Sequence, residues 1–136
     1  LYNNAAASLA SARQFPTNTS QSVSIANQFA ENFKFNHPLL LREGESQSQF
    51  ENFMNTYWNA FENVEMNITE SKSENSINAY RWTFEADHVR SFFGIPATHK
   101  RIKHQGVTVW INNARGCAQK VYFNENLIVL IGQMES

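Results

Sequence analysis

The side chain best suited to proton transfer near neutral pH is histidine, and His88 is the histidine with the most suggestive surroundings. It ends a stretch in which aromatic and polar residues alternate, so Tyr80, Trp82 and Phe84 share its strand face. Asp87 is its neighbour in sequence, points to the opposite face, and cannot orient the ring. An imidazole among rings could protonate or polarise a carbonyl oxygen as an enolate forms. The alternative is a core histidine bonded to a backbone carbonyl.

The other histidines are scattered. His37 lies at the expected end of a helix before Pro38, where ligand contact and simple helix capping are both open. His99 and His104 flank a predicted strand and are interpreted as surface or core residues. These spacings include no pair four residues apart on a helix, so we predict no metal site.

Other polar and aromatic residues are candidates for ligand contact. Tyr57 and Trp58 lie at or beside the apolar stripe of a predicted helix, where core packing is the alternative. A phenol that points into a pocket could bind a ligand oxygen. Tyr122 and Lys120 share a strand face with Asn124. Burial would lower the pKa of Lys120 and suit it to a site, whereas the alternative is an ordinary solvated lysine.

Composition limits the function classes. A chain of 136 residues with 42% hydrophobic content fits one domain with a real core. The net charge of -1 argues against a nucleic-acid partner. Cys117 is alone, which excludes an internal disulfide, and no apolar run reaches the ~20 residues that span a bilayer. A cytoplasmic location is favoured, with a processed secretory leader as the alternative because small residues fill Ala5–Ala12.

Helices are expected in the first half of the chain. Apolar residues at helical spacing predict one from about Ser20 to Phe33, which Pro38 would end. Ser46 followed by Gln49 is typical of a capping box at the start of a second. Its apolar stripe comprises Phe50, Phe53, Met54, Tyr57 and Phe61. Residues 1–19 are interpreted as an N-terminal arm and residues 20–136 as one domain.

After residue 63 the hydrophobic period changes from 3.6 to 2, which indicates strands at about 64–68, 77–88, 101–111 and 116–123. Periodicity cannot decide whether 127–131 is a buried strand or a short helix. Helices followed by an antiparallel meander predict an α+β domain with the helices on one face of a curved sheet. Such packing tends to leave a hollow lined by aromatic side chains, suited to a small, mostly apolar ligand.

Several strings in this order resemble one family. They are Phe35-Asn36-His37-Pro38, Gly44 with the helix ending Ala60-Phe61, Arg81-Trp82-Thr83 with His88, Phe92-Phe93-Gly94-Ile95-Pro96-Ala97-Thr98, Gly106 to Trp110, and Val121-Tyr122-Phe123-Asn124 followed by 127–133. The chain is similar, over about residues 22–134, to the SnoaL-like polyketide cyclases of the nuclear-transport-factor-2-like superfamily. The resemblance implies a cone-shaped α+β domain that encloses a pocket, and a homodimer.

The resemblance also implies a chemistry. Family members that act on polyketides close a ring by intramolecular aldol condensation without metal or organic cofactor, and an aspartate near the end of the sheet moves the proton. The nearest position here is Asn124, whose amide cannot move a proton at neutral pH.

We therefore expect a cofactor-free cyclase or isomerase acting on a small, apolar, oxygenated carbonyl compound. Its predicted catalytic residues are His88 and Asn124, and its predicted ligand contacts are His37, Tyr57, Trp58, Trp82, Trp110, Lys120 and Tyr122. The alternative is a non-catalytic ligand-binding or dimerisation module of the same fold.

Overall fold

The computed structural model describes residues 17–18 and 29–135 of the chain. In that part it contains the strands β1 (Thr17–Asn18), β2 (Phe29–Asn36), β3 (Gly44–Glu45), β4 (Phe61–Glu74), β5 (Ile77–His88), β6 (Arg101–Asn112) and β7 (Ala118–Glu125), with the helices α2 (Ser46–Asn59) and α3 (Leu127–Glu135). The predicted α+β class is confirmed. Most of the predicted N-terminal arm, residues 1–16 and 19, lies outside the described residues.

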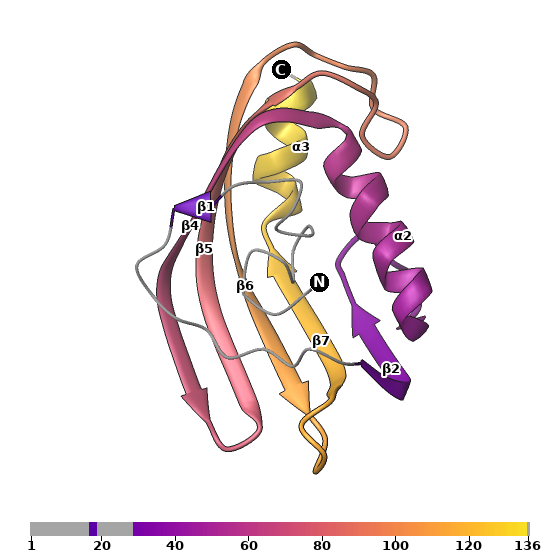
Figure 1. The fold of residues 1–136 in the computed structure, drawn as a ribbon. Coiled ribbons are helices and arrows are strands. Elements are labelled where there is room, and N and C mark those ends of the chain that lie inside the picture. The colour runs from indigo at the N-terminus through magenta and orange to yellow at the C-terminus, as the bar shows by residue number, and fades with distance from the viewer. Residues whose placement is uncertain (1–16, 19–28, 136) are drawn as a thin grey trace.

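The strands form one mixed sheet in the order β1-β4-β5-β6-β7-β2-β3. β4 to β7 make the predicted antiparallel meander, and β2 joins its edge parallel to β7. The β5–β6 pairing is regular from Ile77 opposite Ile111 to Asp87 opposite Arg101. Figure 1 shows α2 beside β2 and β7, with α3 following β7 next to β6.

The first predicted helix is wrong over the part that the structure describes. Residues 29–33 lie in β2, while residues 20–28 fall outside the described residues. Phe29 and Phe33 are four apart, as on a helix, but Phe33 and Phe35 are both buried and follow the period of a strand. Pairing with β7 and packing beneath α2 therefore outweighed a local pattern that suited a helix.

The second predicted helix is confirmed as α2. Ser46 Oγ accepts a hydrogen bond from the Gln49 amide at 3.3 Å, and the Gln49 side chain accepts one from the Glu45 amide at 3.0 Å. These reciprocal bonds occupy amides that the first turn of a helix leaves without partners. The helix turns five large side chains into the core: Phe50, Phe53, Met54, Tyr57 and Trp58. Phe61, the last residue of the predicted stripe, instead begins β4.

The sheet has one face in the core and one toward solvent. On β5 the buried residues are Asn78, Tyr80, Trp82, Phe84, Ala86 and His88, and the ring of Phe84 packs against Trp58 of α2. The alternate residues of β5 point to the opposite face. The antiparallel meander thus has the buried and solvated sides that alternation predicts.

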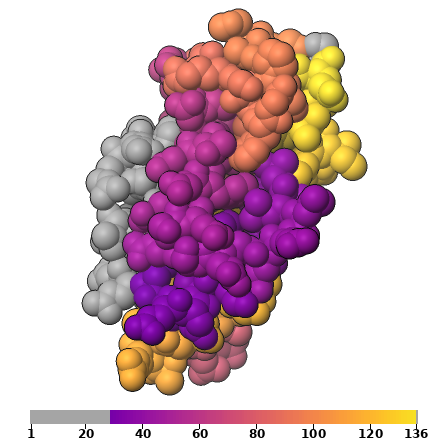
Figure 2. All heavy atoms as spheres, turned by 90° about the vertical axis from the view of Figure 1, so that its right-hand side faces the viewer, coloured from indigo at the N-terminus to yellow at the C-terminus, as the bar shows by residue number. Residues whose placement is uncertain are grey.

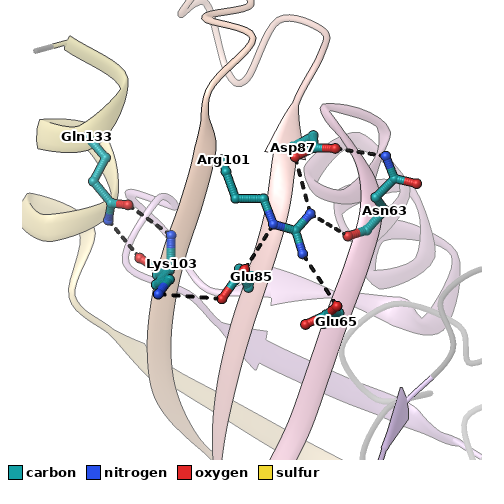
Figure 3. A network of polar contacts seen from close by, with 7 residues as sticks. All are labelled: Asn63, Glu65, Glu85, Asp87, Arg101, Lys103 and Gln133. Carbon is teal, nitrogen blue, oxygen red and sulfur yellow. Dashed lines mark hydrogen bonds and ion pairs between the residues drawn. The ribbon is translucent and has the colours of Figure 1, made fainter.

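On that opposite face Arg101 joins three strands through charged contacts. Its guanidinium lies 3.0 Å from Glu85, 3.2 Å from Asp87 and 3.8 Å from Glu65 (Figure 3). The amide of Asn63 donates to Asp87 at 2.7 Å. The hydrogen bonds from Asn63 and then Arg101 lower the pKa of the Asp87 carboxyl.

The segment after β7, which periodicity left undecided, is the helix α3. It covers the edge of β6 beyond the end of the β6–β7 pairing. The Gln133 side chain accepts a bond from the Lys103 amide at 2.8 Å and donates one to the Lys103 carbonyl at 2.6 Å (Figure 3). A side-chain amide here replaces a neighbouring strand and blocks an open sheet edge.

In the described part, no helix is both long and apolar enough to cross a membrane.

Candidate functional site

A buried carboxylate, Glu125, is the centre of a polar cluster inside an otherwise aromatic core. It is the last residue of β7, and its side chain is only 2% exposed. Its partners are His37, Tyr57 and His104, which come from three other parts of the fold. We call these four residues the Glu125 cluster. A buried charge is tolerated where hydrogen-bond donors or opposite charges surround it.

His37 makes the shortest contact with the carboxylate. Its Nε2 lies 3.0 Å from Glu125 Oε1, and its Nδ1 accepts a hydrogen bond from the Leu39 amide at 3.0 Å. Because Nδ1 accepts, the ring carries its proton on Nε2 and donates it to Glu125. The parallel pairing of Asn36 with Tyr122 sets this position, since it places the residue after β2 level with the end of β7.

His104 approaches the same carboxylate from β6. Gly106 pairs with Glu125, and His104 lies two residues further along on the same face. Its Nε2 is 3.7 Å from Glu125 Oε2, an ion-pair distance too long for a hydrogen bond. Neither ring nitrogen has a hydrogen-bond partner among the described residues, although the side chain is only 1% exposed. The edges of Trp82 and Phe84 pack against the ring.

Gly106 makes this arrangement sterically feasible. A Cβ atom at this position would lie 2.4 Å from the indole of Trp82 and 2.9 Å from the Asn124 carbonyl. Any side chain would therefore displace the indole that packs against His104. Here glycine is required by close packing, and its φ is not the reason.

Tyr57 completes the cluster from α2. Its hydroxyl lies 3.1 Å and 3.3 Å from the two oxygens of Glu125 and donates to that carboxylate. Burial, followed by the charge of Glu125, raises the pKa of Tyr57 well above its usual value. The phenol therefore stays protonated and remains a donor at any pH at which the protein is handled.

The cluster keeps Glu125 ionised. Burial by itself would raise the pKa of Glu125, but the two imidazoles outweigh it and lower the pKa to about 2. The carboxylate is thus a stable anion and a weak base at neutral pH. Such an anion can orient an imidazole and stabilise positive charge on that ring.

In the described part of the chain, no three His, Cys, Asp or Glu side chains are placed to hold a metal ion.

His88 lies apart from the cluster. The ring is fully buried against Phe61, at 5.8 Å between centroids, and Nδ1 lies 2.9 Å from Thr98 Oγ1. The Thr98 amide also donates to Nδ1 at 3.3 Å, which places the ring proton on Nε2. Phe84 pairs with His104, and His88 is four residues further along β5, or about 13 Å. Burial lowers the pKa of His88.

The predicted residues of β7 lie outside the core. Asn124 and Tyr122 are exposed, and Lys120, on the same strand face, is partly exposed. Lys120 forms an ion pair with Glu43 at 3.6 Å. Asn124 therefore points away from the Glu125 cluster, and the carboxylate that the family pattern led us to expect at this strand end occupies the next position.

The predicted tryptophans are all buried. Trp58 packs on Phe84, Trp82 donates to Thr108 Oγ1 at 2.9 Å, and Trp110 donates to the Tyr80 hydroxyl at 3.0 Å. Of these, Trp82 contacts a member of the cluster, His104. Trp58 and Trp110 are part of the aromatic core.

Sequence reasoning named His37 and Tyr57 but missed Glu125 and the role of His104. A signal for Glu125 existed in the strand alternation, because Val121, Phe123 and Glu125 share one face. A carboxylate in an apolar series is the kind of residue that marks a site. Nothing in the sequence linked it to His37, which is 88 positions earlier in the chain.

A pocket of about 350 Å³ lies on the opposite face of the sheet. Its lining includes the polar residues Glu65, Thr83, Glu85, Lys103, Gln105 and Asn126, and it also includes Phe84 and His104. Most of these side chains are polar, and the Arg101 network lies beside them (Figure 3). This pocket is therefore distinct from the apolar hollow that the sequence predicted.

The architecture defines the class of protein. A helix on one face of a bent mixed sheet, with polar groups buried between them, matches the nuclear-transport-factor-2 and ketosteroid isomerase-like fold. The pattern of the SnoaL-like polyketide cyclases matches residues 9–113, and the chain belongs to that family.

Solved structures agree with this fold. A SnoaL-like protein from Jannaschia sp. CCS1 superposes with a TM-score of 0.73 at 14% identity, covering 80% of this chain and 74% of that one. TsrD from Streptomyces laurentii gives 0.67 at 15% identity, over 79% and 77%.

A third similar structure comes from Catenulispora acidiphila. This protein with a ketosteroid isomerase-like fold, in complex with trimethylamine, gives a TM-score of 0.60 at 13% identity, over 79% of this chain and 76% of that one. No curated protein matches the chain significantly. At these identities the likeness concerns the fold alone.

Proposed function

We propose that this protein is an acid–base enzyme of the cyclase or isomerase type, acting on a small, mostly apolar carbonyl compound without an organic cofactor or metal. The observation behind the proposal is the Glu125 cluster, in which a buried carboxylate is surrounded by two imidazoles and a phenol. Membership of the SnoaL-like family supports the reaction class. The predicted homodimer stays a prediction, which light scattering would test.

His104 is the proposed base. The carboxylate of Glu125 favours the tautomer with hydrogen on Nε2, which leaves the lone pair of Nδ1 available. Nδ1 removes a proton from the carbon next to the substrate carbonyl. The C–H electron pair forms the enolate C=C bond, and the carbonyl π pair moves to oxygen. The proton remains on the imidazole.

Glu125 stabilises the charge that this step creates. As His104 becomes an imidazolium, it faces an anion whose donors from His37 and Tyr57 are already in place. Preorganised charge of this kind is effective in a site that excludes water. In a cyclisation, the enolate carbon then attacks a second carbonyl of the same molecule. The resulting alkoxide takes the proton back from His104, so the base is regenerated.

The aromatic side chains around the cluster suggest the substrate class. His37 packs against Phe53 and Phe123, and His104 packs against Trp82. An apolar ring system could pack against these aromatic side chains. A highly charged molecule would lose its hydration there without gaining equivalent partners. Bicyclic ketones are therefore suitable probes.

Proton exchange on a simple ketone tests the proposal. Purified protein is incubated with 2-tetralone in D₂O, and loss of the α-proton signal is followed by NMR. His104→Gln should slow the catalysed exchange by about 10²- to 10⁴-fold, the usual contribution of a general base. Gln105→Ala, an exposed neighbour on the same strand, should retain the wild-type rate.

Two outcomes would count against the proposal. If His104→Gln exchanges at the wild-type rate, the imidazole is not the base. If the wild type binds 2-tetralone without accelerating exchange, a non-catalytic binding module is favoured. The same assay on His88→Gln addresses the prediction from sequence, because a catalytic His88 would require a loss as large as that of His104→Gln.

A further inference from the structure

The Glu125 cluster is closed in this structure. The side chains of His37, His104 and Glu125 are each at most 2% exposed, and Tyr57 is 3% exposed as a residue. A substrate that reaches His104 therefore requires some part of the surrounding structure to move. One described segment that packs against α2 beside the cluster is the loop between β5 and β6, residues 89–100.

The tip of this loop is a tight turn. Phe92 and Ile95 exchange two backbone hydrogen bonds, at 2.8 Å and 2.9 Å. The two residues between them, Phe93 and Gly94, have φ values of 44° and 88°. Positive φ at both central positions is the geometry of a two-residue hairpin turn. The turn is thus closed by its own backbone hydrogen bonds.

The turn is attached to α2 by aromatic rings. Phe92 is fully buried and packs edge-on against Tyr57, at 5.2 Å between centroids. Phe93 is 40% exposed and packs at 5.6 Å on Phe53 and 6.5 Å on Tyr57. Phe53 in turn lies 4.8 Å from the ring of His37. In Figure 2 the loop, in orange at the top, lies directly against α2. The turn therefore covers the wall of the cluster that α2 provides.

The two ends of the loop are held differently. The first end is tied to the chain between α2 and β4, because the amides of Val89 and Arg90 donate to the Ala60 carbonyl at 2.8 Å and 3.1 Å. The returning end is held by His88. Its carbonyl accepts from the His99 amide at 2.8 Å, and its imidazole Nδ1 contacts both the hydroxyl and the amide of Thr98.

We infer that the Phe92–Ile95 turn is a lid over the Glu125 cluster, and that His88 is the positioning residue that holds the returning end of the lid through Thr98. The inference rests on the proposed function, since a lid is useful only to a site that admits a molecule. It gives His88 a role through the loop, at a distance from the reacting atoms.

Residue-resolved modification of histidine tests the lid directly. Diethyl pyrocarbonate labels accessible neutral imidazoles, and mass spectrometry reports the rate at each histidine. Phe93→Ala should raise labelling of His37 and His104 because it removes the ring that covers Phe53 and Tyr57. Ile128→Ala is the matched control, since it removes a more exposed apolar side chain from α3, and it should leave both rates unchanged.

A second pair of variants tests the hold of His88 on the loop. Thr98→Val removes the hydroxyl that contacts Nδ1 and keeps the shape of the side chain. It should raise labelling of the cluster about fivefold, the change in opening equilibrium expected from one ordinary hydrogen bond. Thr98→Ser restores the hydroxyl and should return the rate to the wild-type value. If Thr98 acted only by filling space, Thr98→Val would label like the wild type and Thr98→Ser would not.

The outcomes separate the lid from the enzyme. Unchanged labelling of His37 and His104 in both Phe93→Ala and Thr98→Val would overturn the lid. Equal labelling of Thr98→Val and Thr98→Ser would remove the role of His88. If labelling rises as expected while 2-tetralone exchange is undetectable in the wild type, the lid stands and the catalytic proposal fails.

Discussion

Two groups of carboxylates lie on opposite faces of the same sheet and have opposite surroundings. On the face beneath α2, Glu125 is almost fully buried and is held by neutral or titratable donors. On the other face, Glu85 and Asp87 have side chains about one third exposed and contact Arg101, which is permanently charged. Water solvates the second group, so Arg101 contributes positioning more than stability there.

The difference shows where a carboxylate can do chemistry. A pair such as Arg101 and Glu85 cannot exchange a proton near neutral pH, because the guanidinium does not titrate in that range. Glu125 faces two imidazoles, whose ring nitrogens can both accept and donate a proton. Burial also strengthens each interaction in the cluster. Charge alone therefore does not identify the site, whereas charge, burial and a titratable partner together do.

The largest expected effect comes from removing the buried charge. Glu125→Gln should lower the free energy of unfolding by about 3 to 5 kcal/mol, because breaking a buried pair leaves the remaining partners uncompensated. Glu85→Gln, the matched change on the opposite face, should cost about 1 kcal/mol or less. Urea unfolding followed by tryptophan fluorescence measures both. Equal losses of unfolding free energy in the two variants would contradict the proposed difference between the buried and the partly exposed carboxylates.

Acid should reduce the contribution of Glu125 in a defined window. Its pKa is lowered from 4.5 to about 2 in the folded protein, so its stabilisation is present above about pH 4.5 and is lost as pH falls toward 2. The stability difference between wild type and Glu125→Gln should narrow by roughly 3 kcal/mol across that range. Urea titrations at pH 6, 4 and 2.5 measure it. A constant difference would mean that the folded protein does not hold Glu125 as an anion.

The smallest expected effect is at the neighbouring residue. Asn124→Asp places a carboxylate where the family resemblance suggested one, but this side chain is exposed and faces away from the cluster. Its stability should stay within about 0.5 kcal/mol of wild type, as at most surface positions. The 2-tetralone exchange rate should also be unchanged. A clear gain in exchange would instead place the reacting groups at position 124.

Much of the fold could be predicted because strand alternation is a local pattern. Tyr80 to His88 showed which side chains of β5 enter the core, and the structure agrees at each position. The failure at Phe29–Phe33 has a different cause. Those residues suit either a helix or a strand, and the neighbouring strand that decided the outcome is about 90 positions away in sequence.

The candidate site was only partly predictable. His37 and Tyr57 were recognisable as polar groups near apolar surfaces, with helix capping and core packing as the respective alternatives. The capping alternative was wrong, because His37 follows the strand β2. Asn124 was chosen by resemblance to a family position, and the strand places Glu125, one residue later, on the inner face. A shift of one residue along a strand reverses the face, so a motif without its register cannot locate a catalytic group.

The sequence by itself determined the family, the α+β class and the two faces of the meander, because these follow from short-range periodicity and ordered motifs. Only the tertiary structure decided that His37, Tyr57 and His104 meet around Glu125. Four segments far apart in the chain converge there, and the parallel addition of β2 beside β7 brings the first of them into place. Long-range pairing of this kind depends on the packing of the whole core, which no local pattern of residues encodes.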